Sequence, residues 1–538
     1  MSYIEKAADF EFNQTPFHLG FLPTEQSSPL TGELDKKFAR SIAEGVRNLQ
    51  EVDRNVLEMA KKVLVSPEFK SLCDAIYRVI RGGNTVVFSG CGATGRLSIL
   101  LEAMWRTYAP EYADRVKSIM TGGDYALVKS VESFEDHAVF GARQVRDLGM
   151  KKGDLLVAIT EGGETSSVLG TVKEFTSYGG EAFLLFNNPA PVLREHLERS
   201  REAIDNPLVT VLDLYCGPMA LAGSTRMQAT TSEQLISACA LEVAAGKLYN
   251  EETAMDFAAA FDRLLTGLES DDMVKKMADE IEFEAEIYRS NGFVTYFADR
   301  YMLDLFTDTT ERSPTFMLPG FKKIDDTALP EPWAFVRNPL YPASEVMRRC
   351  LGNREPRCLE WKKADYAAMD APAAIVENPP QINAENLVKI PVGNEFLPTR
   401  YATGKDAAVL FVYNDIPADL KTAAEKEAEK FAFFRVMDGG GIDLPATRMC
   451  IFEHLAVKLQ WNTISTGTMT VLGRVAGNWM SYVAISNKKL IDRAIRLIAE
   501  LGRIDYHTAC LELFRTVEEE KSSAPAVRRT LERLRDND

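Results

Sequence analysis

The sequence lacks the patterns by which metal sites and disulfide frameworks are recognised. Its 538 residues include only 8 cysteines and 5 histidines, and both are scattered along the chain. No two cysteines are spaced as Cys-x-x-Cys, and no histidines form a His-x-x-x-His or His-Glu-x-x-His motif. We therefore expect neither a disulfide scaffold nor a zinc knuckle, and we predict no metal and no cofactor.

Long apolar runs and an excess of basic residues are missing too. No apolar run approaches the roughly 18 residues of a membrane-spanning helix, and the N-terminus has no basic, apolar signal segment. The formal net charge is −16, and an acidic surface repels nucleic acids and anionic membranes. We therefore expect a cytoplasmic protein that binds neither. An anionic ligand would need a local pocket of hydrogen-bond donors.

What the sequence does contain is a repeated unit of a short apolar strand, a glycine-rich loop and a helix. The unit first appears around residues 85–102 and returns around residues 154–178. Strands that alternate with helices predict a parallel, doubly wound sheet. The strands that we expect in this sheet are residues 85–89, 154–159, 181–186 and 208–212.

A second block of the same kind follows, and the last part of the chain is mainly helical in its pattern. We expect strands of the second block at residues 292–297, 334–336 and 408–413. The predicted fold class is α/β, with two flavodoxin-like, doubly wound parallel-sheet domains and a C-terminal helical cap. The predicted units are an N-terminal segment and helix over 1–60, a first domain over 61–285, a second domain over 286–445 and the cap over 446–538.

Two glycine-rich loops follow strands of the first sheet, at the edge where parallel sheets bind ligands. Glycines let the backbone approach a phosphate, and the next helix presents free amide groups at its N-terminus. The hydroxyl groups of Thr94, Thr160 and Thr165 add donors. A single loop of this kind is often a plain turn, but two in one sheet predict a phosphate-binding site.

The first loop also fits the dinucleotide-binding pattern, with Gly90, Gly92 and Gly95 spaced as G-x-G-x-x-G. That function needs an acidic residue at the end of the second strand, which we expect near residues 116–121. The next acid is Asp124, which comes late, after a Gly-Gly pair. We therefore favour phosphate binding over dinucleotide binding.

Two segments supply groups that suit a sugar. Glu132 and Glu135 are three residues apart and share a helix face, so they could accept hydrogen bonds from sugar hydroxyls or move a proton. Ser224 or Thr225 could cap the helix that follows them. Acidic pairs are also typical of solvated surface, and a capping turn needs no ligand.

A basic pair lies near the C-terminus. Lys489 and Arg493 are four residues apart, behind a helix start at Ser486 or Asn487. They therefore share one helix face and could clamp a phosphate dianion. An exposed pair of this kind is otherwise common on solvated helices.

These motifs together resemble a known family. Residues 87–97, 122–124, 132–136 and 223–227 resemble, in order and spacing, the SIS domain shared by N-acetylmuramate 6-phosphate etherases and glucokinase regulatory proteins. Etherases have one SIS domain, whereas the regulatory proteins have two and a helical cap. The length of this chain therefore favours the regulatory-protein branch. Residues 24–35, 461–467 and 485–490 also resemble that branch.

The resemblance implies that a sugar phosphate binds in the first SIS domain, beneath the cap. It implies Glu135 as the one catalytic candidate. The residues that it places around the ligand are Gly92, Ala93, Thr94, Glu132, Glu135, Thr160, Gly162, Glu164, Thr165, Ser224, Thr225, Lys489 and Arg493.

The chain departs from the family at positions that matter for chemistry. Where the etherases have a catalytic glutamate, in the helix after the first loop, this chain has Met104. Glu102 is two residues away and points to another helix face. Gly162 replaces the usual loop hydroxyl, Gln228 replaces a family lysine, and Pro314 stands where the regulatory proteins have a histidine. These departures weaken the expectation of etherase chemistry and leave the sugar unidentified.

Two functions stay open. The sequence favours a regulator or sensor that binds a phosphorylated hexose or amino sugar, with a sugar kinase as a candidate protein partner. The alternative is an enzyme, either an etherase-like phosphosugar lyase or an aldose–ketose isomerase. In the enzyme, Glu135 would take a proton next to a carbonyl-derived carbon, assisted by Glu132 or Glu164.

Overall fold

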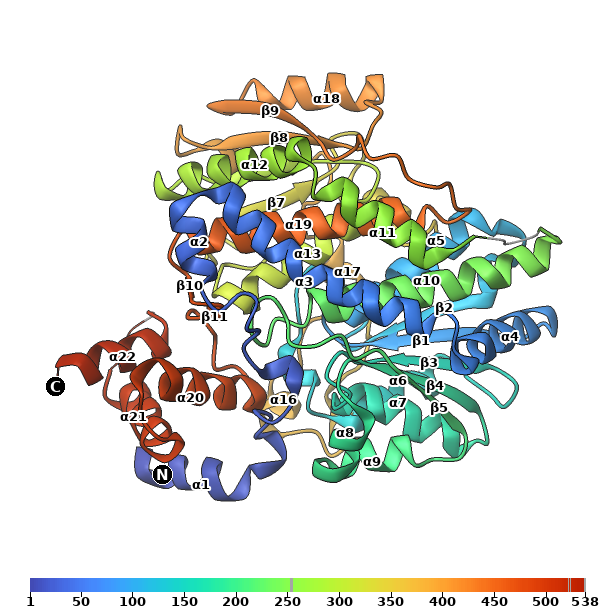
Figure 1. Ribbon diagram of the computed structural model, residues 1–538, viewed down its shortest axis with the longest axis horizontal. Helices are drawn as coiled ribbons and strands as arrows, with labels where there is room; N and C mark the ends of the chain where they lie inside the picture. Colours follow the sequence, from blue (N-terminus) through green and yellow to red (C-terminus); the bar gives the residue numbers. More distant parts are fainter. Residues whose placement is uncertain (252–254, 521, 523, 537–538) are drawn as a thin grey trace.

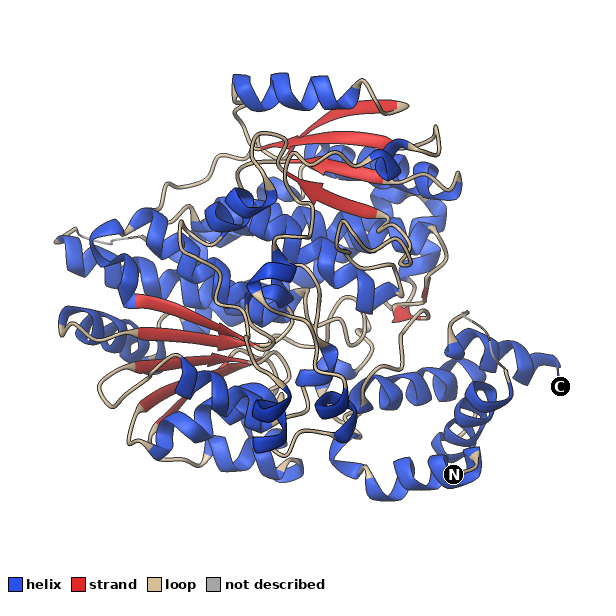
Figure 2. Cartoon of the chain, turned by 180° about the vertical axis from the view of Figure 1, so that it is seen from behind, coloured by secondary structure: helices blue, strands red, loops and turns tan. Residues whose placement is uncertain are grey.

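Two parallel β-sheets, each flanked by helices, organise the chain (Figures 1 and 2). The computed structural model describes residues 1–251, 255–520, 522 and 524–536. The first sheet has the strand order β2-β1-β3-β4-β5, and every neighbouring pair is parallel. This is the flavodoxin-like order, and it confirms the predicted fold class. Its strands are β1 (Val86–Gly90), β2 (Val116–Met120), β3 (Leu155–Ile159), β4 (Glu181–Phe186) and β5 (Val209–Asp213).

The second sheet is smaller, with the order β7-β6-β8-β9, and is also parallel throughout. Strand β9 was not predicted; it is an edge strand on which only Met437 is buried, so it lacks a buried apolar pattern. A short antiparallel ribbon lies near the C-terminal helices. These strands are β6 (Val294–Phe297), β7 (Ala334–Arg337), β8 (Ala407–Val412), β9 (Phe433–Asp438), β10 (Val475–Ala476) and β11 (Trp479–Met480).

The helices of the N-terminal half include two, α2 and α3, that follow one another with a break of a single residue. The backbone of Ser41 is extended, so one helix ends at Arg40 and the next begins at Ile42. The helices of this half are α1 (Tyr3–Asn13), α2 (Leu34–Arg40), α3 (Ile42–Val63), α4 (Pro67–Arg81), α5 (Ala93–Tyr108), α6 (Ala138–Asp147), α7 (Ser166–Ser177), α8 (Ala190–His196), α9 (Glu198–Ile204), α10 (Gln228–Tyr249), α11 (Phe257–Leu268) and α12 (Asp271–Arg289), with the 3-10 turns η1 (Thr15–Phe17), η2 (Pro23–Glu25), η3 (Pro110–Arg115), η4 (Asp124–Leu127) and η5 (Glu132–Phe134).

The C-terminal half contains short helices over residues 340–400, a stretch in which the sequence pattern assigned no elements. Helices of four to eight residues are too short to show a clear periodicity. The helices of this half are α13 (Met302–Phe316), α14 (Ala343–Cys350), α15 (Lys363–Ala368), α16 (Ala373–Glu377), α17 (Ala384–Leu387), α18 (Ala418–Ala428), α19 (Ile451–Val471), α20 (Lys488–Gly502), α21 (Tyr506–Glu519) and α22 (Ala526–Asp536), with the 3-10 turn η6 (Pro398–Tyr401).

A layer of helices lies between the two sheets (Figure 1). Helices α10 and α19 belong to it and are buried on nearly all faces. Helix α19 packs against α12 and α13, and α13 packs against α5. The layer therefore joins the two sheets through one continuous apolar core.

Helices α20, α21 and α22 lie apart from this body and enclose a small core of their own. The N-terminal helix α1 joins them, so that Ala7 and Phe10 pack in the same core as Ile495 and Leu513. Helices α1 and α22 therefore lie at one corner of the molecule (Figure 2). We call these four helices the cap from here on; α19, which lies within the predicted cap over 446–538, packs in the layer between the sheets instead.

Two further properties concern the chain as a whole. All 8 cysteines are free. Of the helices that the structure describes, none combines the length and the apolar character needed to cross a membrane.

Replacing Gly90 should destabilise the protein. A side chain at Gly90 would overlap the backbone carbonyl of Thr94, at the turn between β1 and α5. We expect Gly90→Ala to lower the free energy of unfolding by about 1–3 kcal/mol, measured by urea denaturation. Gly32→Ala is the control, because the nearest atom to its added carbon is 4.0 Å away. Equal stability of the two variants would contradict this reading of the turn.

Candidate functional site

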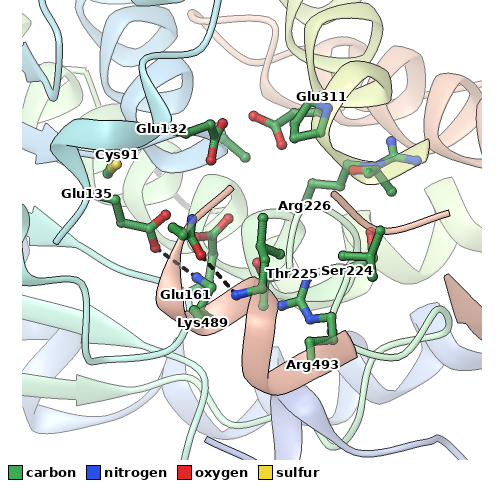
Figure 3. Close-up of a pocket in the computed structure, with 18 of the residues that line it drawn as sticks. Cys91, Glu132, Glu135, Glu161, Ser224, Thr225, Arg226, Glu311, Lys489 and Arg493 are labelled. Carbon is green, nitrogen blue, oxygen red and sulfur yellow. Dashed lines mark hydrogen bonds and ion pairs between the residues drawn. The ribbon is translucent and has the colours of Figure 1, made fainter. Parts of the chain in front are cut away.

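A pocket opens at the carboxyl edge of the first sheet, where β1 and β3 end (Figure 3). Its walls come from three parts of the chain: the loops of the first sheet, helix α13 of the second half, and helix α20 of the cap. The lining residues are Cys91, Gly92, Ala93, Glu132, Glu135, Glu161, Thr165, Gly223, Ser224, Thr225, Arg226, Glu311, Pro314, Thr315, Met480, Val483, Asn487, Lys489, Leu490 and Arg493.

The structure brings most of the predicted site residues to this pocket. Thr94, Thr160, Gly162 and Glu164 lie outside its wall, in the two glycine loops. The predicted residues that line it are Gly92, Ala93, Glu132, Glu135, Thr165, Ser224, Thr225, Lys489 and Arg493.

The Thr94 hydroxyl holds the backbone of the first glycine loop. Gly92 has a φ of 57°, a conformation that favours glycine, and it directly precedes α5. The Thr94 hydroxyl accepts a hydrogen bond from the amide of Cys91 at 3.0 Å and donates one to the Cys91 carbonyl at 2.9 Å. Thr94 therefore shapes the loop, and the loop presents Gly92 and Ala93 to the pocket.

The second glycine loop points a carboxylate into the pocket. The Thr160 hydroxyl donates to the Thr165 hydroxyl at 3.1 Å, so these two groups hold each other. Glu164 lies outside the pocket wall, where it forms an ion pair with Arg199 at 2.8 Å and lies 3.6 Å from Lys489. Glu161, which the sequence did not single out, lines the pocket instead.

Glu132 and Glu135 enter from the loop after β2. Glu132 lies in η5 and Glu135 directly follows it. Burial, together with the charges of Glu135 and Glu311, raises the pKa of Glu132 to about 7. Glu135 is paired with Lys489, whose ammonium nitrogen lies 2.8 Å from its Oε1. The two carboxylates therefore have different environments within one pocket.

The cap supplies the two predicted cations from one helix face. The side chain of Asn487 accepts a hydrogen bond from the amide of Leu490 at 2.9 Å, which confirms the predicted helix start. Burial alone would lower the pKa of Lys489, but Glu135 and Glu164 outweigh it and raise that pKa well above its usual value. Lys489 therefore stays charged inside the pocket.

Arg493 is held by a residue from the N-terminal segment. Its Nη2 lies 2.6 Å from Oε1 of Glu25, and Arg496 lies 2.9 Å from Oε2 of the same carboxylate. Burial alone would raise the pKa of Glu25, but these two arginines hold it at about 2. The N-terminal segment thus fixes the position of the cap helix over the pocket.

The expectation that Ser224 or Thr225 caps the next helix is wrong. Helix α10 begins only at Gln228, behind Met227, and no described side chain caps it. The Ser224 hydroxyl is buried and has no hydrogen-bond partner among the residues that the structure describes. It therefore lies in the pocket wall with an unused donor.

Arg226 also lines the pocket, although the sequence did not identify it as a site residue. Its Nη1 lies 2.8 Å from Oδ1 of Asp308 on α13, and both side chains are buried. Its Nε has no partner within the described part of the chain. Arg226 therefore joins the loop before α10 to the second half of the molecule.

Helix α13 contributes residues that sequence reasoning could not assign to this site. Glu311 reaches the pocket from this helix and pairs with the buried Arg96 of α5. Figure 3 shows Glu311 and Glu132 facing each other at one end of the pocket. Pro314 lies beside Thr315 in the same wall.

A second cavity lies at the carboxyl ends of β6 and β7. It repeats the arrangement of the first, because here α5 of the first half reaches toward the second sheet. Met104 and Tyr108 of α5 line it, together with Arg300 and His454. Met104 therefore faces the second cavity.

Glu102 and Asp124 are structural residues in this fold. Glu102 is buried between Arg354, at 3.0 Å, and Arg357. Asp124 pairs with Arg354 at 2.5 Å and accepts a hydrogen bond from the amide of Arg357. Neither carboxylate faces the pocket, and Asp124 is not placed to bind a ribose in the manner of a dinucleotide-binding fold.

Comparison with known proteins gives similarities to sugar-phosphate proteins. Residues 69–176 match the sequence pattern of the glucokinase regulatory protein N-terminal SIS domain. The chain is 31% identical to an N-acetylmuramic acid 6-phosphate etherase from Salmonella agona over 220 residues, which are 41% of this chain and 68% of that protein. It is 26% identical to the etherase of Bacillus subtilis over 318 residues, 53% of this chain and 98% of that protein. A solved structure, the C-terminal domain of glucosamine-fructose-6-phosphate aminotransferase from Francisella tularensis, covers 79% of this chain and 96% of its own length at 12% identity, with a TM-score of 0.42.

The ion pairs of Glu25 predict a distinct acid sensitivity. Because its pKa is about 2 in the folded protein and about 4.5 when unfolded, Glu25 stabilises the fold above pH 4.5. That stabilisation, on the order of 3 kcal/mol, is lost as the pH falls from 4.5 to 2. We expect Glu25→Gln to be less stable at neutral pH and to lose less stability over this range, measured by urea denaturation at each pH.

The control for this experiment is Glu58→Gln. Glu58 forms an exposed ion pair with Lys61 on the surface of α3, and exposed pairs contribute little. An identical pH dependence of unfolding for the wild type and Glu25→Gln would refute the role assigned to this carboxylate.

Proposed function

The chain belongs to the SIS-domain family that includes the N-acetylmuramic acid 6-phosphate etherases and the glucokinase regulatory proteins, and from this we propose that it binds a phosphorylated sugar in the pocket and acts on it as a lyase or isomerase. The two curated relatives described above, from Bacillus subtilis and Salmonella agona, are named as etherases. The observation that carries the proposal is the ion pair of Glu135 and Lys489 within a pocket that also holds Glu132.

Donors around one side of the pocket suit the phosphate group. The first glycine loop turns at Gly92, directly before the N-terminus of α5, where backbone amides lack helical partners. The unpartnered hydroxyl of Ser224 and the neighbouring Thr225 add side-chain donors. Lys489 and Arg493 supply positive charge from the cap.

Glu135 is the proposed base. Its carboxylate is paired with Lys489, and a ligand phosphate that attracts Lys489 would free that carboxylate to accept a proton. Glu135 would take the proton from the carbon next to the carbonyl of the open-chain sugar. Glu132, with a pKa of about 7, is partly protonated at neutral pH. It would give a proton to the leaving oxygen in a lyase, or to the carbonyl oxygen in an isomerase.

A residue from the second half of the chain also supports the proposal of an enzymatic function. The etherase-like position on α5 is Met104, which lies in the second cavity. The helix in the matching place after the first strand of the second sheet is α13, and its Glu311 lies in the first pocket. Met104 is four residues before the end of α5, and Glu311 is five residues before the end of α13. A carboxylate missing from one helix is thus supplied to the pocket by the other.

A sensor without catalysis is the second candidate. The match of residues 69–176 to a regulatory-protein domain favours it. So does the state of the cap cations, since Lys489 and Arg493 are both paired with carboxylates of the protein. A phosphate would compete for Lys489 and shift the balance of contacts that hold the cap. A sugar kinase is the protein partner that we propose for such a sensor.

Binding and turnover separate the two candidates. We expect hexose 6-phosphates or amino-sugar 6-phosphates, N-acetylmuramic acid 6-phosphate among them, to raise the melting temperature in a thermal-shift screen. Each stabilising compound is then followed for chemical conversion by NMR. Conversion supports the enzyme, and stabilisation without conversion supports the sensor. A screen in which none of these compounds stabilises the protein would reject the pocket as a sugar-phosphate site.

Replacing Glu135 tests the mechanism. We expect Glu135→Gln to lower kcat by about 10²–10⁴ while the ligand still raises the melting temperature, because the amide cannot accept the proton. Asp136→Asn is the matched control: it removes the adjacent carboxylate, which lies outside the pocket wall. Unchanged turnover in Glu135→Gln would exclude Glu135 as the base.

A further inference from the structure

We infer that the pocket is built for a phosphorylated sugar with a free, protonated amine, and that Glu161 binds its ammonium group. This rests on the proposed sugar-phosphate site and narrows the class of sugar. Three features carry it: the chemistry of the second glycine loop, the lack of a cationic partner for Glu161, and the donors elsewhere in the pocket.

The second glycine loop does not suit a phosphate. The Thr160 hydroxyl donates to the Thr165 hydroxyl at 3.1 Å, so Thr165 is the one threonine hydroxyl of the loop that can still donate to a ligand. Gly162 carries no hydroxyl, and the loop adds two carboxylates, Glu161 and Glu164. A phosphate dianion beside these carboxylates would be repelled, most strongly in a partly buried site where the effective dielectric constant is low.

Only one of these two carboxylates is already neutralised. Glu164 pairs with Arg199 at 2.8 Å and lies outside the pocket wall. The side chain of Glu161 lines the pocket and accepts a hydrogen bond from the Thr230 hydroxyl at 3.1 Å. Within residues 1–251, 255–520, 522 and 524–536, no lysine or arginine forms an ion pair with its carboxylate. Glu161 is therefore a partly buried carboxylate whose further acceptor sites face the ligand space.

The cations of the pocket are committed to other carboxylates. Lys489 pairs with Glu135 at 2.8 Å, and Arg226 pairs with Asp308 at 2.8 Å. Arg493 is held by a carboxylate of the N-terminal segment at 2.6 Å. A positively charged group on the ligand is therefore the expected partner of the Glu161 carboxylate.

The protonation behaviour of Glu161 agrees with this arrangement. Burial raises its pKa to about 7; Lys489 acts against the shift, and the charges of Glu311 and Glu135 add to it. An ammonium group beside Glu161 would favour its charged form and lower that pKa again.

Hydrogen-bond donors without partners lie on another wall of the same pocket. The Ser224 hydroxyl and Nε of Arg226 are both buried, and neither has a partner among the described residues. Figure 3 shows both residues on the side of the pocket opposite Glu135, with Glu161 between them. A pocket with donors on one wall and a free carboxylate on another matches a ligand with a phosphate at one end and an ammonium group at the other. Glucosamine 6-phosphate is the simplest such sugar.

Three ligands test the inference on the full-length protein. We expect glucosamine 6-phosphate to bind about tenfold more tightly than glucose 6-phosphate at pH 7, measured by isothermal titration calorimetry, because a charged hydrogen bond replaces a neutral one. N-acetylglucosamine 6-phosphate keeps the nitrogen atom, but its acetyl group removes the positive charge and adds bulk, so we expect it to bind no more tightly than glucose 6-phosphate. Equal affinities of glucosamine 6-phosphate and either neutral sugar would overturn the inference while leaving the sugar-phosphate site intact.

A variant assigns the preference to one residue. We expect Glu161→Gln to reduce the ratio of the glucose 6-phosphate to glucosamine 6-phosphate dissociation constants about tenfold, toward one. In the control Glu164→Gln this ratio should stay as in the wild type. Losing the Glu164 charge near Lys489 could change the affinity for phosphate, but that change would be the same for glucose 6-phosphate and glucosamine 6-phosphate. A ratio that is retained in Glu161→Gln would overturn the assignment. If none of the three sugars binds the wild type, the proposed sugar-phosphate site itself fails.

Discussion

One buried ammonium group joins the parts of the molecule that form the pocket. Lys489 projects from the cap and lies 2.8 Å from Glu135 and 3.6 Å from Glu164, on two different loops of the first sheet. Removing a lysine from water costs several kcal/mol unless its charge is paired. The position of the cap and the pairing of the two carboxylates therefore depend on the same ammonium group, and a ligand anion would have to compete for it.

The chain ends take part in this arrangement. Glu25 of the N-terminal segment neutralises Arg493 and Arg496 on the face of α20 that covers the pocket. Helix α1 packs in the core of the cap. Segments that are separated by more than 450 residues thus share one electrostatic network, and a change at either end of the chain would reach the pocket through it.

Each half of the chain also contributes a helix to the cavity at the sheet of the other half. Helix α13 of the second half brings Glu311 to the first pocket, and α5 of the first half brings Met104 to the second cavity. Both helices lie in the layer between the sheets, where Arg226 and Asp308 pair across the boundary of the two halves. Neither half of the chain contains all the walls of the first pocket. The residues of that pocket therefore come together only when the two halves of the chain are packed against each other.

The sequence by itself determined the five-stranded first sheet, the glycine loops and a helix start at Ser486 or Asn487, because apolar periodicity, glycine turns and helix capping act over a few residues. Only the tertiary structure decided which charges meet. Glu161 and Glu311 in the pocket, Glu25 beside Arg493, and the free hydroxyl of Ser224 depend on contacts between distant segments or on where a helix begins. Local patterns carry no information on such contacts, and the balance of charge in this site was therefore not predictable from the sequence.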